Sequence, residues 1–195
     1  MKKIILVALA LVPFLHSDVK YTYYLNSNLR SETSFKGEVK DGLSRMYQDN
    51  GNLQSESSYK NNKLDGVSKE YYQNGNLKSE VNYKNGVVHG VTKKYFQNSN
   101  LMSEAFFIDA KQDGLCKNYY LNGNLMNEVT YKDSNKNGLQ KSYSSNGTLL
   151  NEIIFKDNVA VEGSFFNQHG HKSQMDKDAL ENEMKSDVIG DPKEI

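Results

Sequence analysis

The sequence predicts an all-β fold in which antiparallel β-hairpins stack into an elongated array. Three observations lead to this prediction: a pattern that repeats every 24 residues, Asn-Gly turns between alternating segments, and an unusual composition. Only 37% of the 195 residues are hydrophobic, yet the chain holds 13 Tyr and 8 Phe and lacks Trp. A thin array suits this composition better than a thick globular core, because each unit buries only one stripe against its neighbours.

The N-terminus has the pattern of a bacterial secretory signal peptide. A short basic start, MKK, is followed by an apolar run from Ile4 to Leu15. We predict a signal peptide over residues 1–17, cleavage near Ser17, and export to the periplasm or the cell exterior. A membrane-spanning helix needs about 20 apolar residues, so we expect no integral membrane span after signal removal.

The repeat array is predicted over residues 21–170, as six full 24-residue units and a degenerate seventh. Its aligned columns hold a Tyr, a Leu, a Glu, an aromatic residue and a Gly. In the fullest copy these are Tyr71, Leu77, Glu80, Tyr83 and Gly90. The Leu column shows the fixed period, because it recurs without insertion at Leu29, Leu53, Leu77, Leu101, Leu125 and Leu149.

Each unit has the pattern of a strand, a tight turn and a second strand. Aromatic and β-branched residues precede Asn74-Gly75, a pair that favours a two-residue type I′ hairpin turn. The segment after the turn alternates, with Leu77 and Val81 on one face and Glu80 on the other. A single hairpin is only marginally stable, which explains why the pattern is repeated.

A two-residue turn would place a basic residue opposite the glutamate of each unit. The same offset predicts five cross-strand ion pairs on one sheet face: Arg45–Glu56, Lys69–Glu80, Lys93–Glu104, Lys117–Glu128 and Lys141–Glu152. We expect each exposed pair to contribute about 0.2–1 kcal/mol. The Tyr71 column would share this face. Its rings then either cover lysine stems or belong to the core, and the second alternative requires a longer loop.

The C-terminal residues 171–195 form a charged tail. Ala179, Leu180 and Met184 have helical spacing, so this tail forms either a short helix or a frayed, disordered end. We expect the atypical end of the array to cap its last exposed sheet edge.

Three segments carry a resemblance to a known family: YYQNGNLKSEVNYKNGVVHG at 71–90, YLNGNLMNEVTYKD at 120–133 and MYQDNGNLQSESSYKNNKLDG at 46–66. With these columns the chain resembles the MORN-repeat variant family of bacterial repeats. The resemblance implies an elongated β-hairpin array. Many similar proteins are labelled as antitoxins of toxin–antitoxin systems of the YwqK type, and others are regarded as scaffolds for protein or membrane contact. The signal-like N-terminus and the lack of Trp depart from that pattern.

No constellation of residues predicts catalysis, and we expect no catalytic residue, cofactor or metal. Cys116 occupies an ordinary strand column without a base to activate it. His89 occupies a polar turn column, and the HGH segment at 169–171 lacks a third metal ligand. A glutamate in every unit is typical of a lattice element rather than of an active site.

The charge balance argues against a nucleic-acid partner, because 24 basic and 24 acidic residues leave no net charge. Repeated Tyr and Lys would also permit stacking on a glycan. We predict a non-enzymatic repeat scaffold that mediates protein–protein interaction in the bacterial envelope. The alternative is an antitoxin-like protein that binds and neutralises a partner toxin. The sequence sets neither the identity of the partner nor the oligomeric state.

Overall fold

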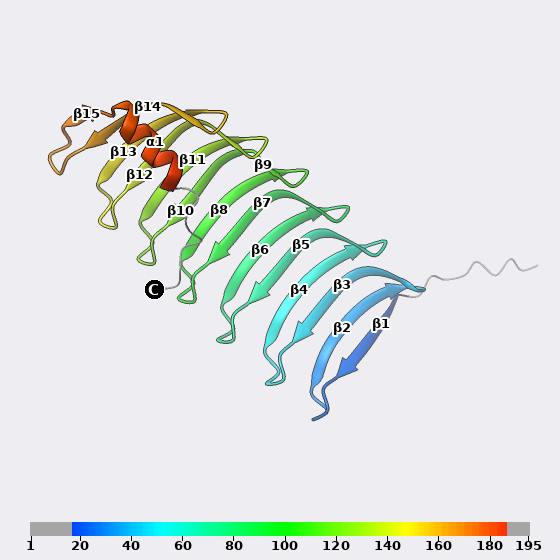
Figure 1. The fold of residues 1–195 in the computed structure, drawn as a ribbon. Coiled ribbons are helices and arrows are strands. Elements are labelled where there is room, and N and C mark those ends of the chain that lie inside the picture. Colours follow the sequence, from blue (N-terminus) through cyan, green and yellow to red (C-terminus); the bar gives the residue numbers. More distant parts are fainter. Residues whose placement is uncertain (1–16, 187–195) are drawn as a thin grey trace, which may run out of the picture.

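A computed structural model describes residues 17–186 and shows an open antiparallel sheet (Figure 1). The sheet of these residues has fifteen strands, of which fourteen follow one another in chain order and β9 pairs off this path, with β8. The curved strands lie side by side, and the turns that connect them line the two long edges of the array (Figure 1). The all-β hairpin array is thereby confirmed. Residues 1–16 of the predicted signal peptide and 187–195 of the predicted tail lie outside the described residues.

Two strands make up each hairpin of the array, and one helix follows the last strand. The elements are β1 (Ser17–Tyr23), β2 (Leu29–Lys36), β3 (Val39–Tyr47), β4 (Leu53–Lys60), β5 (Lys63–Tyr71), β6 (Leu77–Lys84), β7 (Val87–Tyr95), β8 (Leu101–Ile108), β9 (Lys111–Gln112), β10 (Gly114–Tyr119), β11 (Leu125–Lys132), β12 (Asn135–Tyr143), β13 (Leu149–Lys156), β14 (Val159–Phe166), β15 (Lys172–Gln174) and α1 (Lys177–Ser186).

The hairpin loop that contains the first Asn-Gly of a unit is longer than predicted. The Gly75 N–H donates to the Tyr72 carbonyl at 3.0 Å, and the Tyr72 N–H donates to the Asn76 carbonyl at 2.8 Å. Residues 73–75 therefore form a three-residue loop, and the predicted two-residue turn is wrong.

A β-bulge next to this loop offsets the extra loop residue. Tyr71 pairs with Leu77, whereas Lys69 pairs with Glu80, so Lys78 is left without a partner across the strand. The same shift recurs at the equivalent position of the other full units. The strict alternation predicted after the turn is therefore interrupted at Lys78.

The two-residue turn occurs instead at the connection between units. Lys84 pairs with Val87 across Asn85 and Gly86, whose φ angles are 53° and 87°. Two successive positive φ angles are characteristic of a type I′ turn, which explains the second Asn-Gly of the unit.

The glycine column faces the aromatic column across each hairpin. Gly66 pairs with Tyr83, and Gly90 likewise pairs with Phe107. Gly90 has a φ of 104°, and a Cβ atom there would lie 3.3 Å from the Asn82 Cβ. Both the backbone conformation and the crowding favour glycine, which accounts for its recurrence.

Hydrogen bonds join each unit to the next along both edges of the sheet. On the hairpin-loop edge, the Asn after each loop donates its side-chain N–H to a carbonyl of the following loop, as Asn76 does to Gln97 at 2.8 Å and Asn100 to Leu121 at 2.9 Å. On the opposite edge the Gly86 N–H donates to the Leu64 carbonyl at 2.7 Å. The recurring Asn residues therefore hold the lattice together.

The two faces of the sheet differ in what covers them. One face, here called the cap face, is covered at the C-terminal end by α1, which packs against β14 (Figure 1). Ile153 and Phe155 are 0% and 2% exposed beneath it, and Ala179, Leu180 and Met184 of α1 pack against this cluster. The helical stripe predicted in the tail is present, so the tail forms a short helix over these residues.

A single row of side chains crosses the cap face from strand to strand, and we call it the cap-face row. By backbone pairing, the members of the cap-face row are Thr33, Ser44, Ser57, Ser68, Val81, Thr92, Ala105, Cys116, Val129, Gln140, Ile153 and Gly163. Its first members are hydroxyls that bond one another, at 2.8 Å for Thr33–Ser44 and 2.7 Å for Ser57–Ser68. In the described chain, buried hydrophobic side chains are found only from Cys116 onward.

Candidate functional site: the ladder face

The face opposite the cap face, here called the ladder face, carries an unbroken row of alternating charges. Backbone pairing places each basic side chain between two glutamates, one on either side, rather than beside a single one. This charge row consists of Glu32, Arg45, Glu56, Lys69, Glu80, Lys93, Glu104, Lys117, Glu128, Lys141 and Glu152.

The side chains of the five sequence-derived pairs approach to different extents. Nitrogen–oxygen distances are 2.8 Å for Arg45–Glu56, 4.0 Å for Lys69–Glu80, 4.0 Å for Lys93–Glu104 and 3.4 Å for Lys141–Glu152. Lys117 stands opposite both Glu104 and Glu128 in the backbone register. The shortest contacts belong to arginine, whose planar guanidinium can bond two carboxylates at once.

Arg45 is the centre of the tightest cluster in the charge row. Its Nη1 donates to Glu32 Oε1 at 2.9 Å, and the Tyr47 hydroxyl donates to the same oxygen at 2.9 Å. These hydrogen bonds, that from Arg45 foremost, hold the pKa of the Glu32 carboxyl below its ordinary value. Burial, assisted by the bond to Glu32, raises the pKa of the Tyr47 phenol.

Glu32 belongs to the glutamate column of the sequence but was assigned no ion-pair partner, because the residue that faces it within its own hairpin is Tyr21 rather than a basic residue. Its basic partner, Arg45, lies on the next hairpin. A search for basic residues across the connections between units, as well as across the hairpin loops, would have found it.

The first tyrosine column lies on the ladder face. The Tyr47 phenol reaches Glu32, and the Tyr143 phenol donates to Glu128 Oε1 at 3.4 Å. The sequence left two alternatives for these rings: they cover lysine stems on the charged face, or they belong to the core and the loop is longer. The loop is indeed longer, but the phenols lie beside the charge row and not in the core. The bulge reconciles the two, because it absorbs the additional loop residue.

A strip of exposed apolar side chains runs beside the charge row in the C-terminal half of the array. Phe106, Leu115, Leu139 and Ile154 are 40%, 46%, 41% and 42% exposed. Each stands two residues along its strand from a member of the charge row, so it lies on the ladder face. We call these four residues the ladder-face strip.

The ladder-face strip was also missed from the sequence, although a signal was present. The position after each column glycine is apolar in every unit, at Leu43, Val67, Val91, Leu115 and Leu139. The facing positions decide whether this column becomes a continuous strip. They are Ser58 and Asn82 in early units, Phe106 and Thr130 in the middle, and Ile154 at the end of the array.

The reactive side chains of the described residues do not assemble into a recognisable catalytic or metal site. No group of three or more His, Cys, Asp and Glu side chains suited to a metal occurs within residues 17–186. The Cys116 thiol is buried, and this burial raises its pKa. His89 lies in β7 rather than in a turn, so the predicted turn position is wrong, and its Nδ1 lies 3.2 Å from Oδ1 of Asp109 in the turn of the next unit.

None of the helices in the described part of the chain is both long and apolar enough to cross a membrane. The ladder face combines an apolar strip, a row of alternating charges and phenols that bond the glutamates.

Comparison with known proteins identifies the repeat. The MORN repeat variant family matches five consecutive segments, residues 40–61, 64–85, 88–109, 112–133 and 136–157, which together make up more than half of the chain. A comparison with curated proteins finds no match. Among solved structures the chain is similar to one described as "Crystal Structure of TarM", with 16% identity and a TM-score of 0.31, over 49% of this chain and 20% of that chain. The match thus spans about a fifth of that protein's length.

Proposed function

The chain belongs to the MORN repeat variant family, and from this membership we propose that it is a non-enzymatic scaffold that binds another protein along its ladder face. Repeats of this family commonly mediate contact with proteins or membranes. The proposal assigns the contact to a protein and places its centre on the ladder-face strip.

The ladder-face strip is the observation that supports this function. Its four large apolar side chains are each at least 40% exposed; they lie on β8, β10, β12 and β13, and Thr130 of the intervening β11 faces Leu115. Protein interfaces commonly have an apolar centre and a polar rim, and contiguous exposed apolar surface marks such sites. The neighbouring charge row would form the rim on one side of the contact.

The charge row favours a protein over a polyanion. Six glutamates alternate with five basic residues, so the row has almost no net charge. A nucleic acid or an anionic lipid surface would meet repulsion from the glutamates as often as attraction from the lysines. Alternating charges at a fixed spacing instead select a partner surface with matching charges, which gives specificity and fixes register.

A photo-crosslinking experiment in cells tests the contact. A photoreactive amino acid is placed at Leu139 in one variant and at Leu43, the equivalent position of the first full column, in a matched control. We expect one defined protein to crosslink from position 139 and little from position 43. Equal crosslinking from both positions, or crosslinking from neither, would contradict the assignment of the strip.

The affinity of the captured protein provides the second test. Alanine at Phe106 and Leu139 should weaken binding at least about tenfold, as expected for central apolar anchors. Val67→Ala, in the same column but outside the strip, should leave the affinity unchanged. An equal loss in both variants would show that the effect arises from general destabilisation.

The envelope location is a separate part of the proposal and rests on the signal-like residues 1–17. Cell fractionation followed by N-terminal sequencing should find a mature chain that begins near Asp18 outside the cytoplasm. A full-length cytoplasmic chain that copurifies with a toxin would instead support the antitoxin-like alternative.

A further inference from the structure

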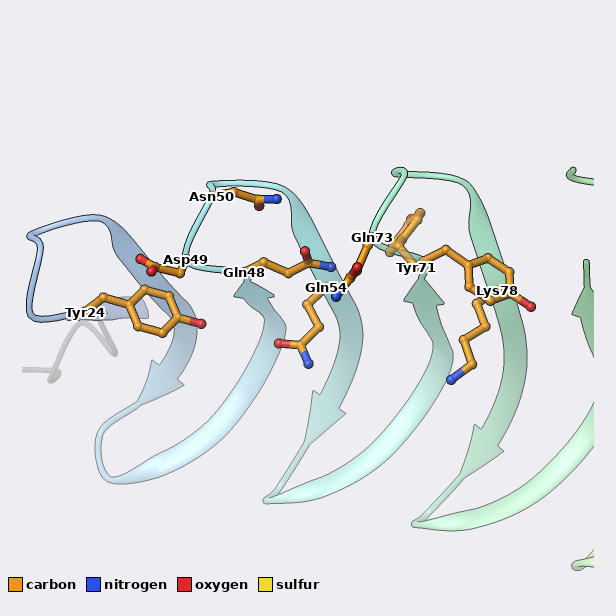
Figure 2. A pocket seen from close by; sticks show the side chains of 9 residues that line it. Tyr24, Gln48, Asp49, Asn50, Gln54, Tyr71, Gln73 and Lys78 are labelled. Atoms are coloured by element: carbon orange, nitrogen blue, oxygen red, sulfur yellow. The ribbon is translucent and has the colours of Figure 1, made fainter. Parts of the chain in front are cut away.

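A groove of about 670 Å³ lies beside the hairpin loops of the first three units (Figure 2). It is lined by Tyr24, Gln48, Asp49, Asn50, Gln54, Tyr71, Tyr72, Gln73 and Lys78. We call it the edge groove. It lies at the N-terminal end of the array, whereas the ladder-face strip belongs to the C-terminal half.

Two columns of the repeat build the edge groove. One is the position after the first column tyrosine, occupied by Tyr24, Gln48 and Tyr72, and the other is the bulge position, occupied by Gln54 and Lys78. A bulge releases a residue from strand pairing and re-aims its side chain. Figure 2 shows the Tyr24, Gln48 and Gln54 side chains near the hairpin loops of the first units.

The tyrosine rings of the groove are held in place before any ligand binds. The Tyr24 hydroxyl donates to the Tyr47 carbonyl at 2.7 Å, and the Tyr72 hydroxyl donates to the Tyr95 carbonyl at 2.7 Å. Each ring is thus anchored to the next unit and is only half-buried, and the Arg30 guanidinium at the bulge of the first unit lies over the Tyr24 ring, 5.7 Å from its centroid. Fixed, partly exposed rings are suited to stacking, because little conformational freedom is lost on binding.

The amides of the groove retain unused hydrogen-bonding capacity. Within residues 17–186 the side chains of Gln48 and Gln54 make no hydrogen bond to another residue. Each offers two N–H donors and a carbonyl acceptor in one plane. Such planar amides can bond pairs of adjacent hydroxyl groups on a ligand.

The charges of the groove are balanced. The Lys78 Nζ lies 3.8 Å from Glu70 Oε2, and Asp49 accepts a hydrogen bond from the Asn26 side chain. A phosphate or carboxylate ligand would find no excess of positive charge here, and a wholly apolar ligand would leave the amides unpaired. The lining suits a neutral ligand that carries both hydroxyl groups and apolar C–H faces.

We propose that the edge groove binds a neutral, extended oligosaccharide, with a sugar ring stacked on Tyr72 and hydroxyl groups bonded to Gln48 and Gln54. Adjacent units lie about 10 Å apart, since each contributes two strand spacings of about 4.8 Å. Two sugar rings of an extended β-1,4-linked chain span a similar length. Successive units can therefore contact successive pairs of sugars.

The same two columns change character after the third unit. There they hold Phe96, Met102, Tyr120, Met126, Ser144 and Leu150, which provide no glutamine amide. The proposed site is therefore confined to the N-terminal end, and the later units supply matched control positions within the same lattice.

Calorimetric titration of the purified chain, residues 18–195, tests the proposal. The probes are chitohexaose and cellohexaose as neutral β-1,4-linked chains, and a heparin hexasaccharide as the anionic comparison. We expect at least one neutral chain to bind, and the variants Gln54→Ala and Tyr72→Ala each to weaken that binding at least about tenfold. Tyr72→Phe, which keeps the ring, should retain most of the affinity, and Met126→Ala should leave it unchanged.

The proposal would be overturned if neither neutral chain bound, if only the heparin hexasaccharide bound, or if Met126→Ala weakened binding as much as Gln54→Ala. Circular dichroism of each variant identifies any loss of fold, and Gln54→Ala alters a side chain without a structural hydrogen bond. Crosslinking from Leu139 on the ladder-face strip is independent of the sugar, so the two proposed contacts can fail separately.

Discussion

The first units and the last units of the array share one backbone lattice but fill it with different side chains. The recurring Asn, Gly and Tyr columns are present at both ends, and so are the loop, the bulge and the connecting turn. On the cap face, however, Thr33 and Ser44 bond as hydroxyls, whereas Ile153 packs under a helix. The lattice columns define the fold, whereas the columns between them set local stability and binding chemistry.

This difference has energetic consequences. A hydrogen-bonded hydroxyl pair contributes roughly 0.5–1.5 kcal/mol net, because both groups also bond water in the unfolded chain. Burying one large aliphatic side chain contributes about 1.5–3 kcal/mol. The C-terminal units should therefore be the stable end of the molecule, and the N-terminal end, where β1 has an open outer edge, should unfold first.

The largest effect is expected from truncating the side chain that is fully buried at the stable end. Ile153→Ala should lower the free energy of unfolding by about 2–4 kcal/mol, because the cavity beneath α1 cannot fully collapse. Ser57→Ala, at the equivalent position of an early unit, should cost less than about 1 kcal/mol. Urea unfolding followed by circular dichroism measures both, and equal losses would remove the contrast between the two ends.

The second-largest loss of stability is expected where α1 packs against β14. A Cβ atom at Gly163 would lie 2.5 Å from Met175 Sδ and 2.9 Å from Leu180 Cδ2. Gly163→Ala should therefore displace α1 and destabilise the chain by about 1–3 kcal/mol. Combining it with Met175→Ala should cost less than the sum of the two single changes, because the shorter side chain makes room. Additive losses would show that the alanine does not contact this side chain.

A smaller effect is expected in the charge row. Arg45→Ala should destabilise the chain by about 1 kcal/mol, since it removes contacts to two glutamates, while Lys93→Ala should cost less than about 0.5 kcal/mol because its nearest contact is longer.

The contribution of Glu32 to stability should depend on pH. The pKa of Glu32 is lowered in the folded chain, so the stability that its carboxylate contributes is present above the unfolded pKa of about 4.3 and is lost as the pH falls through the folded pKa. The difference between wild type and Glu32→Gln should be constant near neutral pH and should vanish in acid. A difference that grows in acid would contradict the sign.

The smallest effect lies where the cap-face row changes from polar to apolar. Thr92 Oγ1 is buried and has no hydrogen-bond partner among the described residues, and Val81 and Ala105 flank it on adjacent strands. Thr92→Val should be neutral or stabilise the chain by up to about 1 kcal/mol, because it replaces an unpaired hydroxyl by a methyl group. A clear loss of stability in thermal unfolding would indicate that this hydroxyl has a partner.

The sequence predicted the array well because its period, turns and columns are local signals. It paired Lys69 with Glu80 through a two-residue turn, and these residues are partners in the structure even though the loop has three residues. The bulge at Lys78 offsets the longer loop, and no pattern of side chains revealed that compensation. The ladder-face strip forms where the variable residues that face a recurring apolar column are also large and apolar, and the edge groove arises from positions that vary between units, so the five main columns did not reveal either.

Native-state hydrogen exchange read by mass spectrometry tests the central claim most directly. If the C-terminal units form the stable end, amides of β11 to β14 should be the slowest to exchange, and those of β1 to β4 should exchange earlier through local opening. Ile153→Ala should then reduce this contrast, whereas Ser57→Ala should leave it nearly unchanged. Uniform protection along the array, or slower exchange in the first units, would contradict the account.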